Sequence, residues 1–144
     1  MIKSIVVGTD GSETAECAVE RAVEIAEPLG AKAHLVSAYE QSAAKAGGGF
    51  EVSRAEWMVS PGVTVESVLE RAVGLFKVKG IETETYARKG DPADAILEVA
   101  QQVEADLIVV GSKGMRGAKR FLLGSVPNKI SHEAPCDVMI VRTH

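Results

Sequence analysis

The chain has 144 residues and a formal net charge of −4 at pH 7, with 46% hydrophobic and 25% charged residues. This length and composition fit one soluble globular domain that spans residues 1–144, and the mild acidity argues against general binding to nucleic acid. No apolar run reaches the roughly 18 residues of a membrane span, and polar residues follow Met1 too soon for a signal peptide, so we expect a cytoplasmic protein with no membrane partner.

The first β–α unit is predicted over residues 2–30. A short β-branched run at 2–7 is typical of a central parallel strand, a turn with the sequence T-D-G follows, and Ser12 is a good N-cap for the helix. Asp10 in this turn follows the carboxyl end of the strand, where open α/β sheets bind ligands. The alternative is that Asp10 only supports the turn.

A second strand is predicted from Ala33 to Tyr39, with Ala38 beside the turn that follows the first strand. His34 has no second ligand at metal-binding spacing, so we expect a packed histidine. Residues 41–60 include A-A-K-A-G-G-G-F-E and indicate a flexible connection, with a helical turn expected around 54–58.

Two more helices and an edge strand are predicted in the middle of the chain. The first helix runs from Pro61 to Gly80, and G-D-P at 90–92 opens the second with an N-cap and a first-turn proline. Between them the chain alternates, as an edge strand does. We expect Ile81, Thr83 and Thr85 to face inward, and Glu82, Glu84 and Tyr86 to face outward.

The stretch from Asp106 to Ile130 carries the strongest functional signal. Its apolar run at 107–110 predicts a buried strand, which breaks at a glycine, and a short helix begins at Ser125. Glycine allows close approach to a ligand or a positive φ, and the glycines here are Gly111, Gly114 and Gly124. A helix N-terminus attracts anions. The predicted seat for a phosphate is formed by Gly124, Ser125 and Val126.

The charges of this stretch agree with an anionic ligand. No acidic residue lies between Asp106 and Glu133, and the basic residues are Lys113, Arg116, Lys119, Arg120 and Lys129. Cations near the start of a helix oppose its dipole, so we expect an anion to compensate them. A P-loop is excluded because G-x-x-x-x-G-K-[ST] does not occur.

The spacing of Gly111, two residues, Gly114, nine residues and Gly124-Ser125 resembles the nucleotide-binding signature of the universal stress protein family. Four further segments match the family: V-V-G-T-D-G-S at 6–12, G-D-P-A-D-A-I-L at 90–97, A-D-L-I-V-V-G at 105–111 and D-V-M-I-V at 137–141. Only residues 40–60 lack a family pattern.

The predicted fold class is α/β. Five strands alternating with four helices imply a doubly wound parallel sheet with helices on both faces. The resemblance implies the strand order 3-2-1-4-5 of a Rossmann-like, adenine nucleotide alpha hydrolase-like fold. In this order Asp10 and the loop after Gly111 flank the same crevice, at the point where the strand order reverses.

The resemblance also implies a regulatory protein of the stress response that binds an adenine nucleotide. The implied ligand is ATP, accompanied by Mg²⁺, or cyclic AMP. The expected nucleotide-binding residues are Thr9, Asp10, Ala38, Val110, Gly111, Gly114, Arg116, Arg120, Gly124, Ser125 and Val126.

Three classes of function stay open: a nucleotide-binding regulator, an enzyme that cleaves or transfers phosphate, and a dimeric interaction protein without ligand. Phosphoryl transfer needs Mg²⁺ and several well-placed groups, and Asp10 is the one obvious carboxylate of the crevice, so we assign no catalytic residue. The intact signature argues against the ligand-free class. A two-component receiver with Asp10 as phosphoacceptor would share the sheet but would not explain residues 111–125.

The last strand, at 136–141, suggests a homodimer. It is an edge in the implied order, yet it has none of the prolines or inward charges that guard edges. Its apolar residues are Val138, Met139, Ile140 and Val141. Antiparallel pairing with a second copy would satisfy the free backbone groups, and the resemblance implies dimers joined there. The alternative is that residues 142–144 or 41–60 cover the edge.

Overall fold

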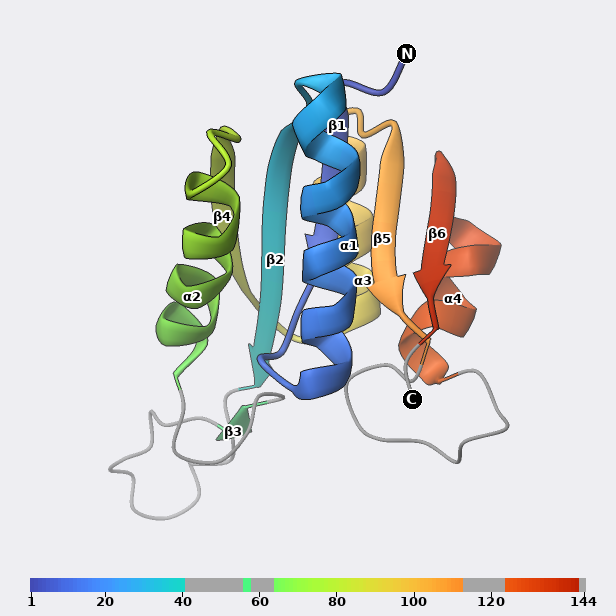
Figure 1. Cartoon of the computed structure of the whole chain (residues 1–144). Helices are drawn as coiled ribbons and strands as arrows, with labels where there is room; N and C mark the ends of the chain where they lie inside the picture. Colours follow the sequence, from blue (N-terminus) through green and yellow to red (C-terminus); the bar gives the residue numbers. More distant parts are fainter. Residues whose placement is uncertain (41–55, 58–63, 113–123, 143–144) are drawn as a thin grey trace.

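The computed structural model describes residues 1–40, 56–57, 64–112 and 124–142, which form one sheet with helices on both faces (Figure 1). In chain order the elements are β1 (Ser4–Gly8), α1 (Glu13–Leu29), β2 (Lys32–Glu40), β3 (Glu56–Trp57), α2 (Val65–Lys77), β4 (Thr83–Lys89), α3 (Pro92–Gln102), β5 (Leu107–Gly111), α4 (Ser125–Glu133) and β6 (Asp137–Val141). Helices α1 and α2 cover one face of the sheet, and α3 and α4 cover the other.

The sheet topology confirms the order predicted for the parallel strands. β1 lies between β2 and β5, while β4 pairs with β2 and β6 pairs with β5, all in parallel. Numbered along the chain, these five strands stand in the order 3-2-1-4-5. A helix separates each strand from the next, so each connection is a crossover from one parallel strand to another.

The short strand β3 corrects one prediction. Its two residues pair antiparallel with β2, with Trp57 opposite Tyr39 and Glu56 opposite Glu40. The helical turn expected around 54–58 is therefore wrong for Glu56 and Trp57. The other residues of that prediction lie outside the described part of the chain.

Side-chain caps begin the three longer helices. The Ser12 hydroxyl accepts a hydrogen bond from the Ala15 amide at 3.1 Å, and the Asp91 carboxylate accepts one from Asp94 at 3.0 Å. α2 is capped in the same way by Thr64 and begins at Val65. The predicted start at 61 lies outside the described residues. Each cap satisfies an amide that has no intrahelical acceptor, and such a cap typically stabilises by about 1 kcal/mol.

The apolar core has one half on each face of the sheet. Phe76, Leu35 and Ile5 are fully buried on the side of α1 and α2, and Ile96 and Ile108 are fully buried on the side of α3 and α4. β1 and β5 are buried on both faces, as their continuous apolar runs predict. The two cysteines, Cys17 and Cys136, are half-buried.

Strand β4 is an edge strand among the described elements, as predicted, but its faces differ from the prediction. Ile81 is buried, whereas Thr85, expected to face inward, is exposed. Tyr86, expected to face outward, is half-buried and packs against the core on the α3 side. Tyr86 lies on this side because its hydroxyl pairs with His34 of β2. The distance between the His34 Nδ1 and the Tyr86 hydroxyl oxygen is 2.9 Å.

Candidate functional site

The candidate site lies at the carboxyl end of the sheet, where β1, β2 and β5 end and where α1 and α4 begin (Figure 1). β1 is flanked by β2 on one side and β5 on the other. The connection that leaves β1 leads to α1 on one face of the sheet, and the connection that leaves β5 leads to α4 on the other face. Such a switch point is the usual ligand-binding crevice of an open α/β sheet.

Three hydrogen bonds hold the turn after β1. The Thr9 amide donates to the carbonyl of Val36 at 3.0 Å, which ties the turn to β2. The Gly11 amide donates to the Thr9 hydroxyl at 3.1 Å, and the Ser12 amide donates to the Asp10 carboxylate at 2.9 Å. Thr9 and Asp10 are only 3% and 4% exposed. Asp10 thus supports the turn, and the hydrogen bond from Ser12 holds its carboxylate just past the carboxyl end of β1.

Gly11 is required by this geometry. Its φ of +84° is rarely adopted by residues with a side chain. A β-carbon at Gly11 would also lie 2.9 Å from Cγ2 of Val68 in α2. α2 therefore packs directly on the turn that carries Asp10.

The ends of β2 and β5 lie beside this turn. Gly8 is opposite Val36 in the β1–β2 register, so Ala38 lies two residues further along, level with the Asp10 turn. Ala38 and Val110 are buried in one apolar cluster, which also contains Val126 of α4. The structure therefore brings these three predicted residues together, with their side chains in the core.

The start of α4 is anchored to the ends of two strands. The Gly124 amide donates to the carbonyl of Ser112 at 3.0 Å, and the Ser112 amide donates to the carbonyl of Val141 at 2.9 Å. Gly124 is the N-cap residue, and because it has no side chain it provides no side-chain cap. The first-turn amides of Ser125 and Val126 have no intrahelical acceptor, and no acidic residue lies in that turn.

The backbone conformations of Gly124 and Gly111 exclude one of the two reasons predicted for a glycine at these positions. Gly124 has φ −65°, and Gly111 is not among the glycines of positive φ. Neither glycine is therefore needed for a left-handed conformation. Close approach of the backbone to a ligand is the other predicted reason for a glycine at 111 and at 124, and it stays a prediction.

Three of the expected site residues, Gly114, Arg116 and Arg120, lie in 113–123, outside the described residues. The structure places the other eight at the carboxyl end of the sheet. They are Thr9, Asp10, Ala38, Val110, Gly111, Gly124, Ser125 and Val126.

Sequence reasoning missed an ion pair between α3 and α4. The Lys129 ammonium of α4 lies 2.7 Å from the carboxylate of Asp94 in α3. The hydrogen bond that Lys129 donates to the Asp94 carboxylate raises the pKa of Lys129 above its ordinary value. For Lys129, the anion expected from the charge pattern is thus supplied by the chain itself. No local spacing could have paired residues on two helices.

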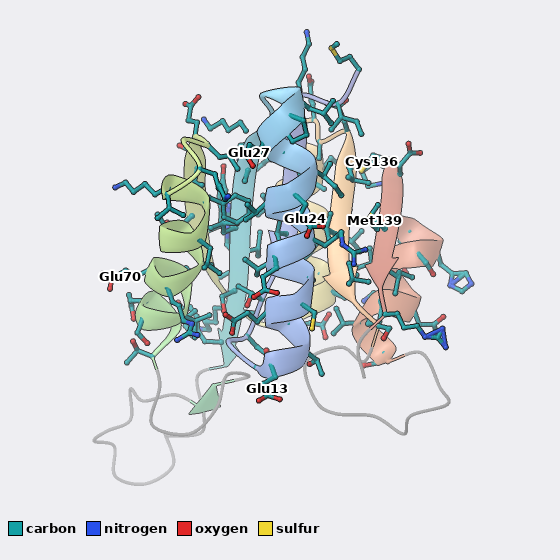
Figure 2. The ribbon with its side chains drawn as sticks, viewed as in Figure 1. Glu13, Glu24, Glu27, Glu70, Cys136 and Met139 are labelled. Carbon is teal, nitrogen blue, oxygen red and sulfur yellow. The ribbon has the colours of Figure 1, made fainter. Side chains whose placement is uncertain are left out.

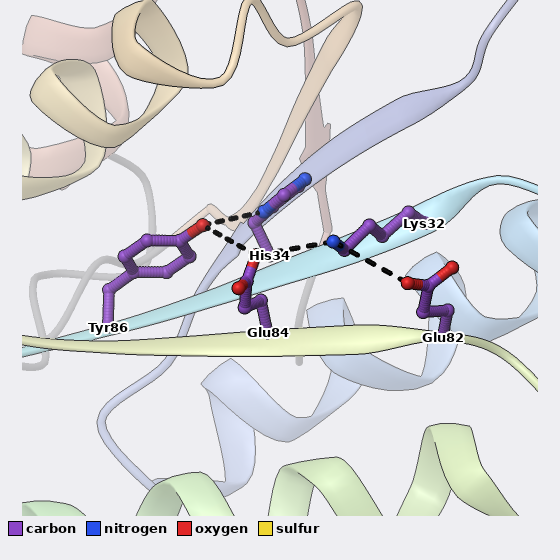
Figure 3. Close-up of polar contacts among 5 residues, drawn as sticks. All are labelled: Lys32, His34, Glu82, Glu84 and Tyr86. Atoms are coloured by element: carbon purple, nitrogen blue, oxygen red, sulfur yellow. Dashed lines mark hydrogen bonds and ion pairs between the residues drawn. The ribbon is translucent and has the colours of Figure 1, made fainter.

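A second polar cluster lies on β2 and β4 (Figure 3). It is near the amino ends of these two parallel strands, away from the carboxyl end of the sheet. The Lys32 ammonium lies 3.3 Å from Glu84 and 3.6 Å from Glu82. The hydrogen bond with Lys32 lowers the pKa of Glu84, and burial lowers the pKa of His34. His34 is 5% exposed, which confirms the packed histidine predicted from the sequence.

No helix in the described part of the chain has both the length and the apolar character needed to span a bilayer. No group of three histidine, cysteine, aspartate or glutamate side chains is arranged there to hold a metal ion.

Comparison with known proteins identifies the family. The family model described as the universal stress protein family matches residues 1–142. A Staphylococcus aureus protein whose name places it among the universal stress proteins is 33% identical, over 98% of this chain and 84% of its own length. A universal stress protein solved in complex with cAMP is 33% identical, with a TM-score of 0.74 over 99% of this chain and 98% of its own. The Archaeoglobus fulgidus universal stress protein solved in complex with dAMP is 25% identical, with a TM-score of 0.65 over 97% of this chain and 98% of its own. This chain belongs to the universal stress protein family.

Proposed function

We propose that this protein is a regulatory protein of the stress response that binds an adenine nucleotide, ATP, in the crevice between the Asp10 turn and the start of α4. One observation carries the proposal. The uncapped first turn of α4 is tied through Ser112 to the ends of β5 and β6, at the switch point of the sheet. Unpaired amides and a positive dipole end at such a position favour a phosphate.

The described residues suggest a division of roles. Thr9 and Asp10 form the base of the crevice beside β2, where the ribose and adenine of a nucleotide would meet the backbone at Ala38. Gly111 and Val110 end β5 on the other side. Glycine at 111 leaves room for a ligand close to the backbone.

The phosphates would lie at the other end of the crevice. We assign them to the amides of Ser125 and Val126 and to the open backbone at Gly124. We also assign Gly114, Arg116 and Arg120 to the phosphates, because of their spacing in the sequence. Mg²⁺ would accompany ATP, bound through the phosphates, and we assign it no protein ligand.

Cyclic AMP is the second candidate ligand. It is favoured by the 33% identical universal stress protein that was solved in complex with cAMP. Cyclic AMP carries a single phosphate charge, so it needs fewer cations than ATP does. The response of affinity to salt and to loss of arginine therefore separates the two ligands.

We also propose a homodimer through β6. Among the described strands β6 pairs with β5 alone, so one of its edges is open to a partner. Val138, Met139 and Ile140 are half-buried and apolar, and Figure 2 shows Met139 on this outer strand. Pairing with a second copy would bury more of these side chains and would satisfy the edge.

Titration calorimetry tests the nucleotide site. ATP and cyclic AMP are added to the nucleotide-free wild type and to Gly114→Val and Gly124→Val, which place a branched side chain where the phosphates would lie. Gly74→Ala is the control, because a methyl group at that exposed position of α2 meets nothing within 4 Å. We expect both valine variants to lose binding and the control to retain it. Wild-type affinity in both valine variants would refute the site.

A further inference from the structure

The two-residue strand β3 lies at the carboxyl end of the sheet, beyond the tip of β2 (Figure 1). It pairs with the last two residues of β2, and Trp57 is opposite Tyr39. Tyr39 is also paired with Lys89 of β4, and its carbonyl accepts a hydrogen bond from the Gly90 amide at 2.6 Å. A strand has two edges, and β4 occupies one of them at Tyr39. β3 therefore lies along the other edge of β2, which is the edge that β1 occupies.

This arrangement makes β3 continue the line of β1 after β1 has ended. β1 ends opposite Val36, and the Thr9 amide donates to the carbonyl of Val36. Backbone groups of a strand turn to the same edge at every second residue, so Ala38 and Glu40 turn theirs to this edge as well. Glu40 is opposite Glu56 of β3. The turn after β1 thus contacts this edge of β2 at one point, and β3 contacts it at another.

The backbone of Ala38 lies between these two contacts. A strand rises about 3.3 Å per residue, so the contacts at Val36 and Glu40 are about 13 Å apart. A purine base is shorter than this gap and can place its polar edge against the amide and carbonyl of Ala38. The turn that carries Asp10 bounds one end of the gap, and β3 bounds the other. β3 is thus positioned as a wall of the pocket proposed for adenine.

Trp57 gives this wall an aromatic residue, and it is the only tryptophan of the chain. β3 has two residues, and among the described strands it pairs with β2 alone. So short a strand gains little stability from the sheet. Stacking of a base on an aromatic residue, in contrast, strengthens binding by about tenfold. A ligand that contains a base therefore explains a tryptophan at this position better than the sheet does.

We propose that Trp57 is a base-binding residue of the nucleotide site, and that the base is held between β3 and the turn after β1. This inference rests on the proposed function, because it needs a nucleotide in the crevice. Trp57 acts on the base and not on the phosphates. Adenosine and ATP share the base, so their binding should depend on Trp57 to the same extent.

Amide hydrogen exchange tests the position of β3. The Glu40 amide faces the edge of β2 beyond the end of β1, and in the described part of the chain β3 is the element that pairs with it there. This amide should be protected in the free protein and should stay protected when ATP is bound. If it exchanges as fast as an unprotected amide in both states, β3 does not form the wall, and the inference is overturned.

Fluorescence of the wild type tests the contact with the base, because all tryptophan emission comes from Trp57. Adenosine and ATP are titrated into the nucleotide-free protein, and calorimetry measures their affinities independently. The emission should change with both ligands, at midpoints that agree with calorimetry. Binding heat without a change in emission would overturn the inference and leave the proposed function intact. No binding heat from either ligand would contradict the proposed function and the inference together.

Two substitutions separate the aromatic ring from the strand. Trp57→Val keeps a residue that favours a strand but has no ring, whereas Trp57→Phe keeps a ring. Trp57→Val should weaken binding of adenosine and of ATP by the same factor, about tenfold, and Trp57→Phe should retain most of the affinity.

Glu56→Gln, at the other residue of β3, is the matched control and should bind adenosine normally. Wild-type affinity in Trp57→Val, or a loss that affects ATP alone, would contradict the inference. Tighter binding by Trp57→Val would mean that β3 occupies the place of the base, which also overturns it.

Discussion

The Nδ1 atom of His34 lies 2.9 Å from the hydroxyl oxygen of Tyr86, although 52 positions separate the two residues (Figure 3). The Tyr86 hydroxyl also donates to the carboxylate of Glu84 at 3.3 Å. Since a tyrosine has one hydroxyl proton, the Nδ1 of neutral His34 must then donate to Tyr86. The Nε2 atom is left as the site that takes up a proton. This hydrogen bond joins β2 to β4 through side chains.

The first prediction concerns pH. Burial, followed by the charge of Lys32, lowers the pKa of His34 below its ordinary value of 6.5. The unfolded chain therefore binds this proton more readily than the folded chain. The free energy of unfolding should decrease as the pH falls below about 6.5, until His34 is protonated in the folded state as well. Glu82 and Glu84 face His34 and reduce the shift without reversing it.

Urea unfolding of the wild type and of His34→Gln checks this at about pH 8 and about pH 5.5. The wild type should lose more stability on acidification than His34→Gln does. His132→Gln, at an exposed histidine of α4, is the control. If the wild type and His34→Gln lose equal stability, His34 is not the group responsible.

The second prediction concerns the packing of α3 on β1. A β-carbon at Gly8 would overlap Cδ1 of Ile96. Gly8→Ala should therefore destabilise the protein by about 1–3 kcal/mol. Ile96→Val removes Cδ1 and should recover part of this loss in the double variant, although alone it costs about 0.5–1.5 kcal/mol. A double-mutant cycle from urea unfolding measures the coupling. Additive effects would show that Ile96 is not the obstacle.

The fold could be predicted largely from local patterns. Continuous apolar runs identified β1 and β5, and the caps Ser12 and Asp91 marked two helix starts. These features are local because propensity and capping act over a few residues. Local patterns do not determine the strand order, because five parallel strands can be arranged in several ways. The order was predicted from the family resemblance.

The missed features all depend on residues far apart in the chain. A two-residue strand such as Glu56–Trp57 has no periodicity to detect. The inward position of Tyr86 depends on His34, and the partner of Lys129 is Asp94 on another helix. At the site, the predicted turn and helix start were local and are found where expected, whereas their proximity follows from the topology.

The third prediction concerns the dimer. Ile140 is half-buried in the outer strand β6. Ile140→Lys places a charge on an edge, a substitution that prevents strand pairing between chains. Light scattering at micromolar concentration should give the mass of a dimer for the wild type and for Ile140→Val, and the mass of a monomer for Ile140→Lys. A monomeric wild type would refute the β6 dimer.

The fourth prediction separates ATP from cyclic AMP. If Arg116 and Arg120 contact the phosphates, their change to Gln should weaken ATP binding more than cyclic AMP binding, and adenosine should respond least. ATP binding should also weaken as salt rises, because charges are screened within about 10 Å at 0.1 M salt. Arg21→Gln, on the exposed face of α1, is the control for the loss of one positive charge. Equal losses for ATP and adenosine would remove the two arginines from the site.

The most direct test is to identify the nucleotide that the protein carries. Freshly purified protein is denatured with acid, and the released small molecules are separated by chromatography and identified by mass spectrometry. We expect ATP, and stripped protein should bind ATP again in calorimetry. Release of cyclic AMP alone would select the second candidate ligand. If no adenine nucleotide is released, and neither ATP nor cyclic AMP gives a binding heat with the stripped protein, the proposed function is contradicted.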